Sequence, residues 1–341
     1  MGMKLILTKP KGMKIPKGIS CPSFIDADKF ERTPYDPRTM GVSISAINKW
    51  LTCRESARLH YIVGLRPNYT KNVFWIGNLN HDCLQEIYLE MRDEPDAPLD
   101  GLIDIVADFC GDKEEEFHEH PIAGVKFEDF QNQLGVTSVL NTKYIQHYYK
   151  EDCAYEFTHV EDEFLITLPS GIPFKGYYDG GVMRKKRQWL LETKFKARWS
   201  DSYLSSLEID LQVGGYLAAM SVDNLDPAGC IFNLVRKPQL KRKVKENLKD
   251  FLTRISEDID SRPEFYFQRL DLRFTRKEIA YSLRRLDCLA VSYVEWCETI
   301  GVKERDPLYN HGACEHKWGP CSYVPFCTKG DTSPYKRACD K

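Results

Sequence analysis

The chain has 341 residues, of which 42% are hydrophobic, so it is long and apolar enough to bury the core of one large domain or two. Its formal net charge of −2 gives no global basic signature, and any affinity for nucleic acid must come from local patches. Without an apolar run near the roughly 18–20 residues that span a bilayer, and without a typical signal peptide, we expect a cytoplasmic protein that has no membrane partner.

The N-terminal part combines an arm with a helix. Residues 1–42 are rich in Pro, Lys and Gly, which is typical of an extended arm. Ser43 or Ser45 can cap a helix that runs toward Tyr61. This helix carries Cys53, which stands apart from the other cysteines.

The next segment is also expected to be largely helical. Apolar side chains at helical spacing predict a helix over about residues 79–91, with His81 near its start. Residues 93–135 are acidic and irregular in pattern, and we expect helix in only part of them. The stretch 43–150 is therefore predicted to be a helical region that carries Cys53 and His81.

From about residue 155 the periodicity becomes that of strands. Residues 163–168 alternate between polar and apolar side chains and end at a Pro-Ser-Gly turn. A basic turn at 184–187 separates the next two predicted strands. The remaining predicted elements of this part are strands at 174–182, 188–195 and 231–235, and a helix at 207–220.

The region after this part is predicted to be helical. Residues 241–259 have the pattern of a charged helix. Thr275 and Glu278 form a capping box for a long helix that extends through Trp296. We expect residues 241–300 to be a helical insertion that can bind a protein partner.

Two acids and a lysine lie in adjacent predicted strands. Asp179 ends the sequence Gly-Tyr-Tyr-Asp, and Glu192 and Lys194 follow after the hairpin. Two carboxylates from neighbouring strands can face one Mg²⁺ or Mn²⁺ ion, which prefers hard oxygen ligands. Glu192 and Lys194 are two residues apart and share a strand face, so the ammonium group can stabilise charge that develops beside the ion.

The Glu-x-Lys triplet alone is weak evidence because 29% of the chain is charged. An exposed strand face with an ion pair gives the same pattern. The apolar Trp-Leu-Leu sequence before Glu192 favours a position close to the core. Asp179 precedes two glycines and would also suit a turn, but the pattern of residues 174–182 fits a strand better.

These motifs resemble the PD-(D/E)XK nuclease superfamily, and within it the RecB-like branch that includes the CRISPR-associated adaptation exonucleases and the AddB subunit. The resemblance implies an α/β, restriction-endonuclease-like core in which helices flank a central mixed β-sheet, with extra helical segments. It also implies that His81, in Gly-x-x-x-His, is a metal ligand together with Asp179, Glu192 and the backbone carbonyl of Thr193.

The same resemblance extends to the helix after the acids. Gln212 and Tyr216, four residues apart, match the Gln-x-x-x-Tyr motif, which in this branch contacts DNA or positions the lysine. Catalytic roles are thereby implied for Asp179, Glu192, Lys194, Gln212 and Tyr216. The proline of the superfamily's name is absent before Asp179.

Four of the twelve cysteines need an explanation other than burial in a core. Cys53 and the late Cys314, Cys321 and Cys327 supply four thiolates, the usual complement for a [4Fe–4S] cluster. The iron–sulfur members of the same branch also have one early and three late cysteines. The spacing between their first two late cysteines is commonly shorter than that between Cys314 and Cys321. Zn²⁺ is the alternative because it also takes four thiolates, and His316 can replace one of them.

Basic residues flank the predicted acidic site in the sequence. Lys185, Lys186 and Arg187 lie before it, and Lys196 and Arg198 lie after it. Such a set can follow the phosphates of DNA, and we predict that it binds DNA. A charge run can equally be an ordinary solvated face.

The sequence and the resemblance together predict a metal-dependent deoxyribonuclease. It is expected to be an exonuclease on single-stranded DNA ends that uses one or two Mg²⁺ or Mn²⁺ ions and contains a structural [4Fe–4S] cluster. The alternative is a non-catalytic DNA-binding or assembly subunit with the same fold and an iron–sulfur or zinc site, against which the intact acid–lysine set argues. The expected division of the chain is an arm at 1–42, a helical region at 43–150, a nuclease core at 151–240, a helical insertion at 241–300, and a cysteine cluster and tail at 301–341 that packs with the N-terminal helical region.

Overall fold

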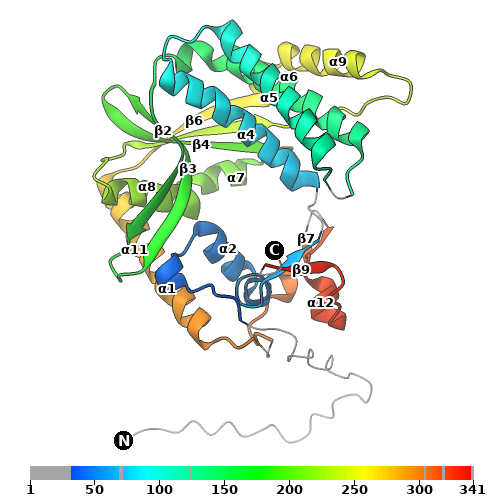
Figure 1. Ribbon diagram of the computed structural model, residues 1–341. Helices are drawn as coiled ribbons and strands as arrows, with labels where there is room; N and C mark the ends of the chain where they lie inside the picture. Colours follow the sequence, from blue (N-terminus) through cyan, green and yellow to red (C-terminus); the bar gives the residue numbers. More distant parts are fainter. Residues whose placement is uncertain (1–31, 69–71, 123, 303–304, 317–318, 339–341) are drawn as a thin grey trace, which may run out of the picture.

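The computed structural model of the protein describes residues 32–68, 72–122, 124–302, 305–316 and 319–338. In that part of the chain, helices cover both faces of a five-stranded sheet, and a smaller lobe lies beside them (Figure 1). Most of the predicted N-terminal arm lies outside the described residues. No helix of the described part is both long and apolar enough to cross a membrane.

The central sheet and the crossover that it needs come from residues 156–273. Their bounds are β2 (Glu156–Thr167), β3 (Pro173–Arg184), β4 (Arg187–Lys196), α7 (Asp201–Ser206), η3 (Leu207–Ile209), α8 (Leu211–Val222), β5 (Gly229–Arg236) and β6 (Phe267–Arg273). The strand order is β2-β3-β4-β5-β6, and only β4 and β5 are parallel neighbours. Because a parallel pair cannot be joined by a tight turn, the chain crosses from β4 to β5 through α7 and α8.

Two apolar clusters, one on each face of the sheet, hold the layers together. Strand β5 is buried along almost its whole length, as expected for a strand covered on both faces. One cluster joins the sheet to α8, to α2 (Ile44–Thr52) and to α11 (Arg276–Thr299). The capping box predicted at Thr275 and Glu278 is present at the start of α11.

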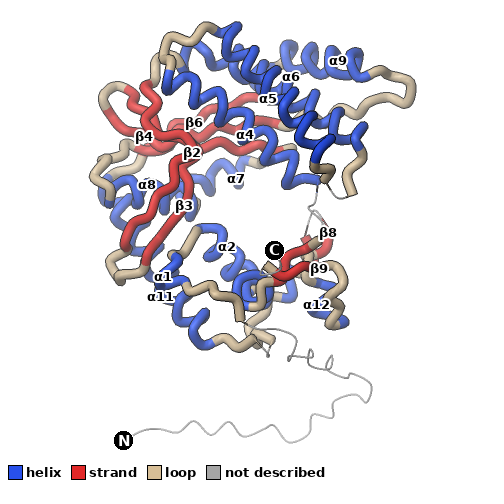
Figure 2. The backbone as a smooth tube through the Cα atoms, in the orientation of Figure 1, coloured by secondary structure: helices blue, strands red, loops and turns tan. Residues whose placement is uncertain are grey.

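The other cluster joins the opposite face to four helices, which form the upper layer in Figure 2. These are α4 (Asn72–Asp93), α5 (Leu99–Glu119), α6 (Phe127–Asp152) and α9 (Leu248–Ser261). Helices α4, α5 and α6 pack on one another, and α9 lies on α6. His81 therefore projects from a helix that crosses over the sheet.

The smaller lobe brings together segments from both ends of the described chain. Its elements are α3 (Arg54–Ala57), the short π-helix η2 (Arg58–Ile62), β1 (Leu65–Pro67), η4 (His311–Ala313), β7 (Glu315–His316), β8 (Gly319–Pro320), α12 (Val324–Lys329) and β9 (Tyr335–Arg337). The short helix α1 (Pro37–Met40) packs instead against β3 and α11. Strand β1 pairs with β9, so residues near position 65 lie against residues near position 336. A small apolar core that includes Leu59, Tyr323 and Phe326 fills the lobe.

The predicted fold class, an α/β protein with a central mixed sheet flanked by helices, is confirmed. Two predicted helices and the 241–300 segment differ in detail from the sequence interpretation. The helix expected to run toward Tyr61 is interrupted at Cys53, where the backbone is extended. The helix expected from residue 241 begins at Leu248, and the 241–300 segment also contains α10 (Pro263–Tyr266) and the edge strand β6.

Candidate active site and cysteine lobe

The acidic residues lie where the sheet forks. Pairing between β3 and β4 runs from the hairpin turn to Gly180 and Leu191, and the next residues along are Asp179 and Glu192. Beyond that point β4 continues beside β5, whereas β3 continues beside β2 and, at its start, bridges to Val42. Two strands that separate leave room between them for side chains from both, and for a helix above.

Asp179 is held in place from two sides. One carboxylate oxygen, Oδ2, accepts a hydrogen bond of 2.9 Å from the backbone N–H of Thr193. The same oxygen lies 3.9 Å from Nδ1 of His81, which reaches it from α4. Burial lowers the pKa of His81, and the carboxylate of Asp179 opposes that shift, so the imidazole is neutral at neutral pH. A neutral imidazole is the form that binds metals.

Glu192 is completely buried, and its two oxygens have different surroundings. Oε1 accepts hydrogen bonds from the side chains of Lys194 and Gln212. Oε2 has no hydrogen-bond partner although it is inaccessible to solvent. Desolvation, together with the charge of Asp179, raises the pKa of Glu192, and the ammonium group of Lys194 opposes that shift. A buried oxygen without a partner is costly, and a cation is one group that would satisfy it.

Lys194 stands beside both acids. Burial lowers the pKa of its ammonium group, but the carboxylates of Glu192 and Asp179 outweigh burial, so the pKa is raised and the group stays charged. Gln212 is fixed because Asp210, the N-cap of α8, accepts hydrogen bonds from the first N–H groups of that helix. The side chain of Gln212 then reaches Glu192 at 2.9 Å.

Tyr216, for which a catalytic role was predicted, also packs in the core. Its ring is almost fully buried and forms edge contacts with Phe164 and Tyr178. Burial raises the pKa of its hydroxyl, and the charge of Glu192 adds to the effect. The phenol therefore stays neutral and lies within electrostatic range of the acids. Gly176 faces the same rings, and a Cβ there would collide with Phe164.

One acid at the fork was not predicted. Glu161 of β2 lies between Val160 and Asp162, which pair with Gly180 and Tyr178, the two neighbours of Asp179 on β3. His81, Glu161 and Asp179 each offer a ligand atom, and these atoms lie within 4.8 Å of one another. Burial, with the charges of Asp179 and Asp82, raises the pKa of Glu161 to about 7. No sequence pattern identified it, because the strand was predicted to begin only at residue 163.

The structure separates the basic residues into two groups. Lys185 and Lys186 form the β3–β4 turn and Arg187 begins β4, so that Glu192 lies five residues further along the strand, roughly 16 Å from Arg187. Lys196 and Arg198, in contrast, line a cavity of about 390 Å³ together with Lys237.

That cavity adjoins the acidic fork. Phe195, which also lines it, places its ring 5.1 Å from the ring of His81. Two aromatic side chains follow at the same end of β4: the ammonium group of Lys196 lies 4.1 Å from the ring of Tyr203, and the guanidinium of Arg236 lies 4.0 Å from the ring of Trp199. Positive charge and aromatic surface therefore occur together beside the acids.

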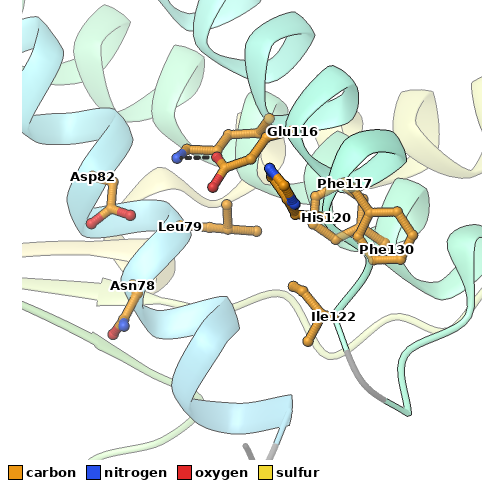
Figure 3. Close-up of a pocket in the computed structure, with 9 residues that line it drawn as sticks. Asn78, Leu79, Asp82, Glu116, Phe117, His120, Ile122 and Phe130 are labelled. Carbon is orange, nitrogen blue, oxygen red and sulfur yellow. Dashed lines mark hydrogen bonds and ion pairs between the residues drawn. The ribbon is translucent and has the colours of Figure 1, made fainter. Parts of the chain in front are cut away.

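A second, smaller cavity lies on another side of α4. Its volume is about 170 Å³, and Asp82 of that helix lies across it from Glu116 and His120 (Figure 3). Leu79, Phe117 and Phe130 make much of its wall apolar. None of the residues predicted for the active site lines this cavity.

The four predicted cysteine ligands come together in the smaller lobe. Cys53 occupies the break between α2 and α3, and the backbone N–H of Cys321 donates to the carbonyl of Cys314 at 2.8 Å. Cys321 and Cys327 pack against the lobe's apolar core. All four are half-buried and none is in a disulfide.

The thiols influence one another electrostatically. Burial raises the pKa of Cys321, and the charges of Cys53 and Cys314 add to that shift. Burial raises the pKa of Cys327 to about 12, with contributions from Cys321 and Cys53. A cavity of about 680 Å³ opens beside Cys314 and Cys327. The side chain of His316, the alternative ligand, lies outside the described residues.

Buried polar groups connect this lobe to the rest of the protein. The guanidinium of Arg58 is inaccessible to solvent and donates two hydrogen bonds of 2.8 Å to Glu55 and one of 2.7 Å to the carbonyl of Val302. Glu55 also accepts from the backbone N–H of Asp306, whose carboxylate accepts from the indole of Trp296 on α11. The cysteine lobe is thus anchored to a core helix.

Comparison with known protein families finds a match that covers most of the chain. The family model of the PD-(D/E)XK nuclease superfamily matches residues 41–328, a span that contains both the acidic fork and the four cysteines. No curated protein matches the chain.

Proposed function

The chain belongs to the PD-(D/E)XK nuclease superfamily, whose members are metal-dependent nucleases, and on that premise we propose that it is a deoxyribonuclease that degrades single-stranded DNA ends with Mg²⁺ or Mn²⁺. The observation that carries the proposal is the fork itself. Neutral His81, Asp179 and buried Glu192 meet there beside the ammonium group of Lys194.

The residues at the fork fit a divalent cation. Oε2 of Glu192 is buried without a partner, and Asp179 offers carboxylate oxygen close to the imidazole of His81. Hard oxygen donors with one imidazole suit Mg²⁺ or Mn²⁺. We propose His81, Asp179, Glu192 and the backbone carbonyl of Thr193 as the ligands. A cation bound there would polarise the scissile phosphate and lower the pKa of a water molecule.

The remaining residues orient these groups. Gln212 and Lys194 both donate to Oε1 of Glu192, which leaves Oε2 as the oxygen that is free to bind a cation. Lys194 remains charged and can stabilise the negative charge that develops on phosphate during hydrolysis. Tyr216 supports the arrangement from the core side by packing against the β2–β3 hairpin.

Features beside the fork support single-stranded DNA as the substrate. Lys196, Arg198 and Lys237 give the adjoining cavity positive charge that can contact phosphates. Trp199 and Tyr203 offer aromatic surface on which unpaired bases can stack. The turn residues 185–187 lie too far along β4 to contact the same phosphate as Glu192. We therefore propose that these residues contact DNA phosphates further from the cleavage site.

We further propose that Cys53, Cys314, Cys321 and Cys327 hold a structural [4Fe–4S] cluster. Four half-buried thiols lie in one lobe, and burial raises the pKa of the Cys321 and Cys327 thiols, which disfavours their thiolate forms in the absence of a metal. Metal binding removes that penalty, because the metal stabilises the thiolate form. Iron and sulfide analysis with the visible absorption spectrum of the purified protein tests this proposal. If the purified protein contains zinc and no iron, the four cysteines hold Zn²⁺ instead of an iron–sulfur cluster.

End-labelled DNA tests the nuclease proposal. Single- and double-stranded substrates are incubated with Mg²⁺, Mn²⁺ or chelator, using wild type, Asp179→Asn and the matched control Asp201→Asn, whose side chain is exposed on α7. We expect metal-dependent shortening of single strands by wild type and by the control. Asp179→Asn should bind DNA and leave it uncut.

Two outcomes would contradict this proposal. Cleavage by Asp179→Asn at the wild-type rate would remove Asp179 from the site. DNA binding without cleavage by wild type in every metal would favour the alternative, a non-catalytic DNA-binding or assembly subunit. A protein partner at residues 241–300 stays a prediction, since much of that segment packs on this chain's own sheet and helices.

A further inference from the structure

A row of polar side chains crosses three strands of the sheet beside the fork. Thr193 of β4, Asn233 of β5 and Arg269 of β6 lie directly opposite one another in the strand registers. The amide of Asn233 donates to Oγ1 of Thr193 at 3.2 Å and accepts from Nε of Arg269 at 2.7 Å. Thr193 and Asn233 are buried, and the side chain of Arg269 is 6% exposed. None of the sequence motifs includes Asn233 or Arg269.

The guanidinium of Arg269 also reaches the helical layer that covers this face of the sheet. It forms an ion pair with the buried carboxylate of Asp152, the last residue of α6. It donates to the hydroxyl of Tyr144 on the same helix at 2.9 Å and lies 3.8 Å from the ring of Tyr148. One side chain of β6 therefore fixes α6 on the sheet.

Helix α6 in turn holds α4 at two points on either side of His81. The hydroxyl of Tyr144 is hydrogen-bonded to that of Tyr88, seven residues after His81, at 2.8 Å. The amide of Asn141 donates to the side chain of Asn80, the residue directly before His81, at 3.3 Å. The location of the imidazole over the sheet thus depends on the location of α6.

Thr193 is the residue of β4 at which the fork needs support. Pairing between β3 and β4 ends at Leu191, so in the described part of the chain Thr193 pairs with β5 alone. On its open side its backbone N–H donates to Asp179 at 2.9 Å. Because Asn233 holds the side chain of Thr193, the same contact restricts rotation of the peptide that holds Asp179.

We propose that Arg269 is a positioning residue of the metal site, which fixes the Thr193 peptide through Asn233 and the helix that carries His81 through α6. This inference rests on the proposed function, because it takes the fork to be where a cation binds. In this role Arg269 touches neither the cation nor the nucleic acid. A planar guanidinium can hold several partners in one fixed geometry, whereas a lysine ammonium group is a single point charge.

The affinity for Mn²⁺ tests the proposal without any measurement of cleavage. The purified protein, without DNA, is titrated with Mn²⁺ by calorimetry, and denaturant unfolding gives the stability of each variant. Arg269→Lys keeps a positive charge but cannot hold all of the partners at once. The matched control is Arg184→Lys at the hairpin end of β3, because Arg184 also pairs with an aspartate, Asp271, and lies 4.1 Å from an aromatic ring, that of Trp189.

Two substitutions at Thr193 examine the other end of the row. Thr193→Val removes the hydroxyl, keeps the backbone carbonyl and suits a strand, whereas Thr193→Ser keeps the hydroxyl. We expect Arg269→Lys and Thr193→Val each to weaken Mn²⁺ binding about 10-fold, as for other groups that orient metal ligands. Thr193→Ser and Arg184→Lys should bind Mn²⁺ as wild type does. The double variant Arg269→Lys/Thr193→Val should bind no more weakly than the weaker single variant, because both changes interrupt the same row.

Unchanged Mn²⁺ affinity in either Arg269→Lys or Thr193→Val would overturn the proposal, and so would an equal loss in Arg184→Lys. If Arg269→Lys does not fold, the comparison of Thr193→Val with Thr193→Ser decides. A wild-type protein that binds no Mn²⁺ would refute the metal site and the positioning role together. Mn²⁺ binding that follows the expected pattern, without cleavage of any nucleic acid, would refute the nuclease proposal and leave the positioning role standing.

Discussion

The acidic fork and the cysteine lobe are assembled in opposite ways. Most of the fork comes from one continuous stretch, β2 to α8, and only His81 is added from α4. The lobe needs both chain ends, and one of its buried hydrogen bonds joins Glu55 to Asp306, 251 residues apart. The comparison suggests that the fork can be altered with little effect on folding, whereas the lobe cannot.

The largest effect is expected from removing a cluster ligand in the lobe. Cys321→Ser should lower the free energy of unfolding by up to about 5 kcal/mol, because the cluster would no longer close most of the chain into a loop. Thermal unfolding and iron content measure this loss. The control Cys288→Ser changes an exposed cysteine outside the lobe and should have the melting temperature and the iron content of wild type. An unchanged melting temperature for Cys321→Ser would show that the lobe does not depend on a cluster.

Next in size is the buried ion pair that anchors the lobe. Arg58→Met should cost about 3–5 kcal/mol of unfolding free energy, because it leaves the carboxylate of Glu55 buried without its partner. The double variant Glu55→Gln/Arg58→Met should recover part of that loss in denaturant unfolding. Arg38→Met, which breaks an exposed pair with Glu298, should change little. Equal effects at Arg38 and Arg58 would contradict the anchoring role.

At the fork the expected effect is on rate. Lys194→Met should lower the cleavage rate about 10²–10³-fold, since a charged group aimed at the reacting phosphate is lost. The melting temperature is measured alongside, because the substitution also removes the ion-pair partner of buried Glu192. Lys186→Met, at the distant β3–β4 turn, serves as the control and should stay within about twofold of wild type. Comparable losses for the two lysines in single-turnover assays would argue against a special role for Lys194.

The smallest effect is expected from the residue that orients Glu192. Gln212→Ala removes one hydrogen bond to Oε1, worth about 1 kcal/mol, so cleavage should slow about fivefold. Gln239→Ala, an exposed residue at the neighbouring cavity, is the matched control. A change in unfolding free energy larger than the change in activation free energy would make Gln212 a packing residue only.

The sequence predicts the parts of the site that regular patterns encode. Glu192 and Lys194 follow an apolar stretch of strand and lie two residues apart, and Gln212 lies two residues beyond an N-cap aspartate. Strand and helix periodicity therefore place them together. Glu161 escapes such reasoning, because its left-handed backbone departs from strand alternation and is enforced by tertiary structure.

Proximity along the chain also misleads where strands are long. Arg187 and Lys196 both flank Glu192 in the sequence, yet they occupy the two ends of β4. Only Lys196 lies beside the cavity next to His81. Strand β6 was missed because its charged residues resemble the helices around it, although its pairing with β5 completes the sheet.

Binding of a cation at the fork is expected to stabilise the β2–β3 hairpin. Glu192 lies on a strand paired in parallel with β5, whereas Asp179 and Glu161 belong to a hairpin that has left β4. An ion held by both arms would fasten that hairpin to the rest of the sheet. At a hundred times its dissociation constant the ion would contribute about 2.7 kcal/mol, and backbone amides of residues 162–178 would exchange with deuterium more slowly once it is bound.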